Sequence, residues 1–336
     1  MQENTDINLL LKNYFSKTVS LSRPSVNGGN NHGYIVNCGD ERYFLKRYFS
    51  SSGDRRNRCE TEFVFSEYCW GFGEQNIPKP IKKWGDQNLA LFSFLPGERL
   101  SCVDEKAVSD AARFIHNLNK DVHKKAQLLP NASDASFSLS GHLSNIEGRL
   151  SLLSAIKVES SISEQVINFV KQEMKPLFAQ FCDCANSSEN DYADLPKSGR
   201  IISPSDFGFH NALNYKNKLY FLDFEYGGWD DPAKLLVDFF LQPEIPVPSE
   251  YFSLFVERAF PSHCAESLTN RSKVLHTFLC VKWACILLNS FILEGKNRRT
   301  FAKKIENPEQ QLRKAKQMLK RANSREQYES SRFIRN

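Results

Sequence analysis

The chain has 336 residues, enough to bury a full hydrophobic core and to form about two domains or lobes. Hydrophobic residues make up 41% and charged residues 25%, an ordinary globular composition, and a net charge of +5 does not by itself indicate a nucleic-acid partner. No secretory signal and no membrane span is apparent, and the nine cysteines form no CxxC pair. We therefore expect a cytoplasmic protein with reduced thiols and without structural zinc.

The first part of the chain is predicted to be rich in strands. A short amphipathic helix over 8–15 precedes a strand, a turn rich in glycine and asparagine, and two further strands. Gly28 and Gly29 permit positive φ, so the backbone there can curl over a phosphate and offer N–H groups to it. Most Asn-Gly pairs are plain turns, but this one precedes a strand that carries a lysine.

That strand runs from Arg42 to Tyr48 and is aromatic and apolar apart from its cations. Side-chain alternation places Lys46 on one face together with Tyr48. Lys46 then either extends to solvent, which is the commoner case, or faces a phosphate-binding cleft.

A helix is predicted over 55–70 and carries Glu60 and Glu62. A strand lysine paired with a helix glutamate is the arrangement that positions nucleotide phosphates in kinases. The spacing allows either glutamate, and Glu62 is favoured because it shares a helical face with Phe65.

A further strand is predicted over 89–95, and Pro96-Gly97 ends it. Most of the chain beyond this break has helical periodicity, whereas the part before it is mostly strand. The sequence therefore predicts an N-lobe over 1–95 and a C-lobe over 96–336.

The most informative stretch is 201–240, which contains Asp206, Asn211 and Asp223 beside short apolar runs. Two strands joined by a tight turn at 216–218 would bring these side chains to one rim. One carboxylate, Asp206, could then accept a hydroxyl proton while Asn211 and Asp223 hold Mg²⁺ through oxygen, as phosphoryl transfer requires. The alternative is an ordinary hairpin with polar loop residues.

The chain resembles the aminoglycoside phosphotransferase/choline kinase group, a phosphotransferase family. The resemblance rests on the order of five features: the glycine turn, the strand lysine, the helix glutamate, the Pro-Gly break and the polar loop. The resemblance covers about 19–293 and is strongest over 201–238. The family's loop usually reads His-Gly-Asp-x-His-x-x-Asn. Here Pro204 and Ser205 replace the leading His and Gly, Gly208 replaces the inner His, and His210 follows two residues later. Because the first His normally supports the loop, its loss concerns loop geometry more than chemistry.

The resemblance implies an α+β, two-lobed, protein-kinase-like fold, with a small antiparallel-sheet N-lobe containing one main helix and a larger, mostly helical C-lobe. It also implies a site that uses ATP or GTP with Mg²⁺. The nucleotide phosphates would be covered by Gly28, Gly29, Asn30 and Asn31 and held by Lys46 with Glu62, and the purine would lie against Ser93, Phe94 and Leu95.

Within this family pattern, Asp206-Phe207-Gly208 spells DFG but belongs to the catalytic loop, so Asp206 is the expected base. The metal-binding carboxylate is Asp223, followed by Phe224-Glu225. The run 226–232 and Asp238 are expected to brace the site from the larger lobe.

A hydroxylated small molecule is the expected acceptor, with a sugar, sugar derivative or amino alcohol preferred. Three alternatives stay open: an aminoglycoside-modifying kinase, a pseudokinase that binds nucleotide as an interaction module, and a nucleic-acid-binding protein using the basic segment 296–325. The simplest interpretation of that segment is a basic helix face exposed to solvent, so nucleic acid is not the expected partner.

Overall fold

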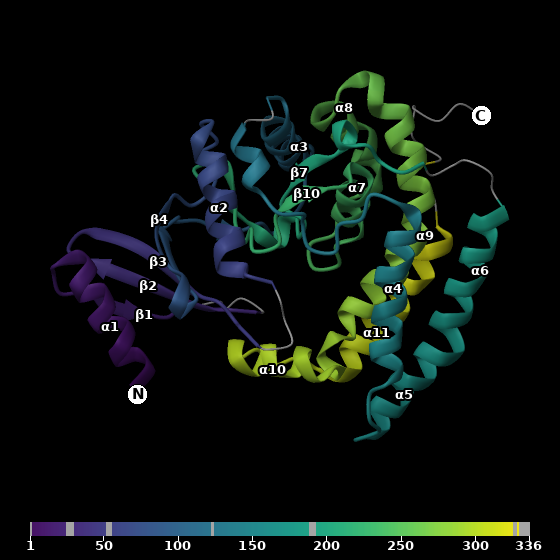
Figure 1. The fold of residues 1–336 in the computed structure, drawn as a ribbon, viewed down its shortest axis with the longest axis horizontal. Helices are drawn as coiled ribbons and strands as arrows, with labels where there is room; N and C mark the ends of the chain where they lie inside the picture. Colours follow the sequence, from purple (N-terminus) through teal and green to yellow (C-terminus); the bar gives the residue numbers. More distant parts are fainter. Residues whose placement is uncertain are drawn as a thin grey trace.

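A computed structural model describes residues 2–24, 30–51, 56–121, 124–187, 193–324 and 328. Within these ranges a strand-rich part is followed by a mostly helical part (Figure 1). This arrangement confirms the predicted α+β class. The lobe boundary at Pro96 stays a prediction.

The first part is built on a five-stranded antiparallel sheet in the order β1-β2-β3-β5-β4. Its strands are β1 Ser20–Ser22, β2 His32–Cys38, β3 Glu41–Arg47, β4 Pro80–Trp84 and β5 Leu89–Ser93. β2 and β3 are joined by a two-residue turn in which Gly39 takes a φ of +61°, a conformation that glycine adopts without strain.

A helix covers each face of this sheet. Helix α1, Gln2–Phe15, packs on the face that carries Leu45, and helix α2, Arg58–Gly71, packs on the face that carries Tyr48. The alternation predicted for this strand is therefore confirmed. It directs Lys46 toward α2 rather than toward α1.

The second part holds two small antiparallel sheets and most of the helices. β7, Ile201–Ser203, pairs with β10, Gly228–Asp230, and β6, Glu98–Arg99, pairs with β8, Ala212–Tyr215, which in turn pairs with β9, Lys218–Phe221. The helices are α3 Glu105–Asn119, α4 Leu139–Ser154, α5 Ser161–Phe169, α6 Lys175–Ser187, α7 Pro232–Leu241, α8 Phe252–Ala259, α9 Ala265–Leu287, α10 Leu293–Ala302 and α11 Pro308–Lys320.

Helix α9 lies at the centre of this second part and packs against α4, α7 and α11 (Figure 1). Helix α11 and the turn after it contribute Leu312, Ala315, Leu319 and Ala322, all of which are buried. Helix α10 instead reaches back to the sheet, where the Phe301 ring stacks on His32 at a centroid distance of 4.3 Å.

Several element bounds differ from those predicted. The helix expected from Arg55 begins at Arg58, because the Asn57 side chain caps it by accepting the Glu60 N–H at 3.0 Å. The strand predicted over 42–48 runs over Glu41–Arg47, and the strand predicted over 89–95 ends at Ser93. A π turn at Val170–Met174 separates helices α5 and α6. None of the helices in the described ranges combines the length and hydropathy that a bilayer crossing needs.

Candidate active site

A buried lysine joins the sheet to helix α2 and to the second part of the chain. The Lys46 Nζ lies 2.6 Å from Glu62 Oε2 and also contacts Asp223 Oδ1. Tyr48, on the same strand face, donates its hydroxyl to Glu62 Oε2 at 2.8 Å. The structure thus brings together three residues predicted from sequence, two of them 177 positions apart.

The choice between the two helix glutamates follows from helical phase. Glu62 is turned inward and its side chain is 7% exposed, whereas the Glu60 side chain is 47% exposed and pairs with Lys83. Glu62 is therefore the partner of Lys46. Burial raises the pKa of Glu62 to about 7, against the opposing pull of the Lys46 ammonium.

Lys46 stays protonated although it is buried. Burial alone disfavours the ammonium, but the carboxylates of Asp223 and Glu62 outweigh it and raise the pKa of Lys46 above its usual value. A cation is therefore held permanently at this position, which suits a site that receives anionic phosphate.

Asp223 follows β9 and has a φ of +66°, in the left-handed region that non-glycine residues rarely adopt. The hairpin before it closes through Lys216 and Asn217, both with positive φ, as a tight primed turn requires. Within the described ranges, Asp223, Glu62 and Glu225 each place a carboxylate oxygen within 4.8 Å of the others. Oxygen donors of this kind suit a hard divalent cation.

The predicted phosphate-covering turn is only partly described. Gly28 and Gly29 lie outside the described residues. Asn31 donates its Nδ2 to Glu225 Oε2 at 2.7 Å, and Asn30 donates to Glu225 Oε1 at 3.2 Å. Asn30 and Asn31, at the end of the turn, are thus hydrogen-bonded to Glu225, two residues after Asp223.

The loop after β7 carries Asp206, whose side chain is 35% exposed and therefore accessible to a substrate hydroxyl. Phe207 and Phe209 are buried and anchor the loop against Phe239 of α7. Asn211 donates its Nδ2 to the Asp206 carbonyl oxygen at 3.0 Å, which directs its amide oxygen away from that contact. A metal contact of this oxygen stays a prediction.

His210 lies against the expected base, with its Nε2 3.3 Å from Asp206 Oδ1. A Cβ added at Gly208 would lie 2.8 Å from the His210 Nδ1, so glycine makes room for the ring. Although burial raises the pKa of Asp206, its contacts with His210 lower that pKa overall, so the carboxylate is ionised.

The segment predicted to meet the purine is fixed by its neighbours. Ser93 N–H donates to Lys79 O at 2.9 Å, and Phe94 N–H donates to Arg42 O at 3.4 Å. The Arg42 guanidinium lies 4.3 Å from the Phe94 ring centroid. A contact of Ser93, Phe94 or Leu95 with a purine stays a prediction.

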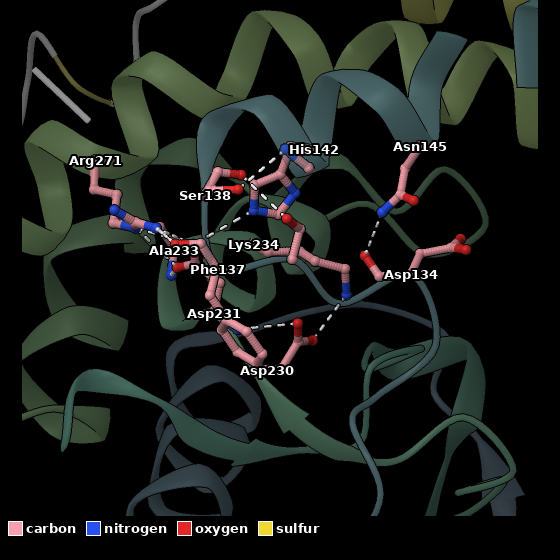
Figure 2. A network of polar contacts seen from close by, with 12 residues as sticks. Asp134, Phe137, Ser138, His142, Asn145, Asp230, Asp231, Ala233, Lys234 and Arg271 are labelled. Atoms are coloured by element: carbon pink, nitrogen blue, oxygen red, sulfur yellow. Dashed lines mark hydrogen bonds and ion pairs between the residues drawn. The ribbon is translucent and has the colours of Figure 1, made fainter. Parts of the chain in front are cut away.

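The run after Asp223 forms a buried frame. β10 pairs with β7, so Gly228 lies opposite Ser203 at the start of the loop that carries Asp206. Asp231 then caps α7 by accepting the Ala233 N–H at 2.9 Å and binds Arg271 through both carboxylate oxygens, as Figure 2 shows.

Sequence reasoning assigned no role to Glu225 or Lys234. Glu225 is 2% exposed and binds the asparagines of the glycine turn, and Lys234 is 1% exposed. A signal existed for Lys234, because the helix 232–241 is apolar apart from Lys234 and Asp238, and a buried lysine needs a polar partner.

Neither a protein-family model nor a curated protein sequence matches the chain. Solved structures do match. An ethanolamine kinase of Plasmodium vivax superposes with a TM-score of 0.61 at 13% identity, over 90% of this chain and 82% of that one. Choline kinase LicA of Streptococcus pneumoniae superposes with a TM-score of 0.58 at 13% identity, over 95% of this chain and 99% of that one.

A third match is the spectinomycin phosphotransferase APH(9)-Ia in complex with ADP and spectinomycin, with a TM-score of 0.56 at 10% identity over 98% of both chains. At such identities the similarity concerns the fold. This chain therefore has the two-lobed, protein-kinase-like fold found in aminoglycoside phosphotransferases and ethanolamine and choline kinases.

Proposed function

We propose that the chain is a small-molecule kinase that transfers the γ-phosphate of ATP or GTP to a hydroxyl group. The observation that carries the proposal is the buried contact of Lys46 with both Glu62 and Asp223. A permanent cation aligned by a helix carboxylate and lying beside a metal-type carboxylate is what nucleotide phosphates require. Nucleotide complexes of proteins with this fold support the same assignment.

Asp206 is the proposed base. Its partly exposed carboxylate is ionised and can accept the proton of the acceptor hydroxyl as the oxygen attacks the phosphorus. The loop anchors Phe207 and Phe209 hold the carboxylate in place, so the chain's contribution is mainly positioning.

Asn211 and Asp223 are the proposed magnesium ligands. Their oxygens fit a hard cation, because the Asn211 amide nitrogen is already occupied by the Asp206 carbonyl and the Asp223 carboxylate is a third exposed. Bound Mg²⁺ would neutralise phosphate charge. Lys46, Asn30 and Asn31 would bind and orient the phosphates.

The acceptor is proposed to be a sugar, a sugar derivative or an amino alcohol. The test is turnover and thermal shift with ATP and GTP plus Mg²⁺ against a panel of these compounds and aminoglycosides. We expect a phosphorylated product from one acceptor class. Stabilisation by nucleotide without turnover of any acceptor would contradict the proposal and indicate a pseudokinase.

A further inference from the structure

Ser205, directly before the proposed base, has an unusual backbone conformation. Its φ is +66°, in the left-handed region that glycine favours and other residues rarely adopt. The family loop that this chain resembles has glycine here and a supporting histidine before it, whereas this chain has Ser205 and Pro204. Such a conformation persists only where surrounding contacts determine it.

Three hydrogen bonds hold Ser205. Its N–H donates to Ser203 Oγ at 2.9 Å, and its hydroxyl donates to Ser133 O at 3.2 Å. The same hydroxyl accepts from Lys234 Nζ at 3.3 Å. The hydroxyl therefore uses both its donor and an acceptor position, and glycine could make neither side-chain contact.

Lys234 cannot move away from this contact. Its side chain is 2% exposed, and its Nζ lies 2.8 Å from Asp230 Oδ2 and 3.5 Å from Asp238 Oδ2. Figure 2 shows the Lys234 ammonium directed at Asp230, inside the frame made by β10 and α7. Lys282 completes the group by binding Asp238 at 2.6 Å, so two ammonium groups balance two carboxylates.

We propose that Lys234 is a positioning residue of the catalytic loop: through Ser205 Oγ it fixes the peptide before Asp206 and so aims the base. This inference rests on the proposed function. It means that the chain supports its loop from α7 where the leading histidine is missing. The Pro204-Ser205 replacement is then no argument for the pseudokinase alternative.

The test is a double-mutant cycle on MgATP turnover, measured with the acceptor found by screening or with water as acceptor. We expect Ser205→Ala and Lys234→Met each to lower kcat about ten- to a hundred-fold, because a small misplacement of a reacting group has effects of that size. The KM for MgATP should stay within about two-fold, since nucleotide contacts are untouched. The double variant should be no slower than Ser205→Ala alone, because that change already removes the contact with Lys234 together with the bond to Ser133 O.

Lys282→Met is the matched control. It removes another buried ammonium, 7% exposed, from Asp238 without touching Ser205, so a merely structural role of the charge group would lower kcat in both lysine variants. We expect its kcat to equal that of the wild type at a temperature where both are folded. An equal loss of kcat in Lys282→Met, or multiplicative losses in the cycle, would overturn the proposal.

Amide exchange of the loop supplies a readout independent of turnover and of the stability of Lys234→Met. Ser205→Ala keeps the charge group intact, and we expect the Asp206 N–H, which bonds to Pro204 O at 2.9 Å, to exchange at least about ten-fold faster. Wild-type exchange and wild-type kcat in Ser205→Ala would refute the role of Lys234. A wild-type chain that phosphorylates no acceptor would instead refute the proposed function, whatever the exchange of the loop.

Discussion

Replacing Glu62 by glutamine tests the buried ion pair at the centre of the site. The change keeps the shape of the side chain but removes its charge. Glu62 Oε2 is 2.6 Å from Lys46 Nζ and accepts the Tyr48 hydroxyl at 2.8 Å, with a side chain only 7% exposed. Both contacts lose a charged acceptor in the variant.

The expected loss of stability in Glu62→Gln depends on the contacts that Lys46 keeps. Removing one partner of a buried pair costs roughly 3–5 kcal/mol when the other charge is left uncompensated. Lys46 keeps its contact with Asp223, so we expect a smaller loss of unfolding free energy, about 1.5–3 kcal/mol, the range for a charged hydrogen bond. Urea unfolding measures this loss directly.

The catalytic effect should accompany the stability effect. Without Glu62 the Lys46 ammonium is drawn to Asp223 alone and no longer aligned for nucleotide phosphates. We expect kcat/KM for MgATP to fall by at least about ten-fold, which corresponds to ~1.4 kcal/mol of transition-state stabilisation.

Glu60→Gln is the matched control on the same helix. Its side chain is 47% exposed and pairs with Lys83, and exposed pairs contribute at most about 1 kcal/mol. We expect wild-type turnover and nearly wild-type stability. Equal effects of the two substitutions, or wild-type behaviour of Glu62→Gln, would show that the Lys46–Glu62 pair does not have the role assigned to it.

Three further predictions concern the metal, the frame and pH. Asn211→Ala should raise the Mg²⁺ concentration for half-maximal turnover by about ten-fold or more, and an unchanged Mg²⁺ titration would exclude it as a ligand. Gly228→Ala should lower the unfolding free energy by roughly 2–3 kcal/mol, because the added Cβ would collide with a neighbouring backbone carbonyl. Gly148→Ala is the control: its Cβ would meet open space on a helix, so the unfolding free energy should rise by about 0.5–1 kcal/mol. Burial raises the pKa of Asp134, but the ion pair with Arg149 lowers that pKa overall. The stability that Asp134 contributes is therefore present above the ordinary carboxyl pKa and is lost as pH falls through the lowered pKa. Asp134→Asn should make the free energy of unfolding, measured by urea unfolding at each pH, fall less steeply in acid.

Local periodicity predicted much of the fold and of the nucleotide side of the site. Strand alternation placed Lys46 on the α2 face, and helical phase favoured Glu62 over Glu60, because both depend only on neighbouring residues. The two ends of α2 were harder to place, since the cap at Asn57 is a side-chain contact rather than a periodic signal.

Contacts between distant segments could not be predicted from pattern alone. The bonds of Asn31 to Glu225 and of Lys234 to Ser205 join residues 194 and 29 positions apart, and no local pattern pairs them. Lys234 could be recognised only as a buried cation in need of one. Which acceptor it meets depends on the pairing of β7 with β10, which is a property of the whole fold.

The most direct test of the central claim compares the wild type with Asp206→Ala in a phosphoryl-transfer assay with MgATP and the acceptor panel. We expect a phosphomonoester product from the wild type, loss of transfer in the variant, and nucleotide affinities within about two-fold of each other, because the base does not hold the nucleotide. Wild-type transfer by Asp206→Ala would contradict the account.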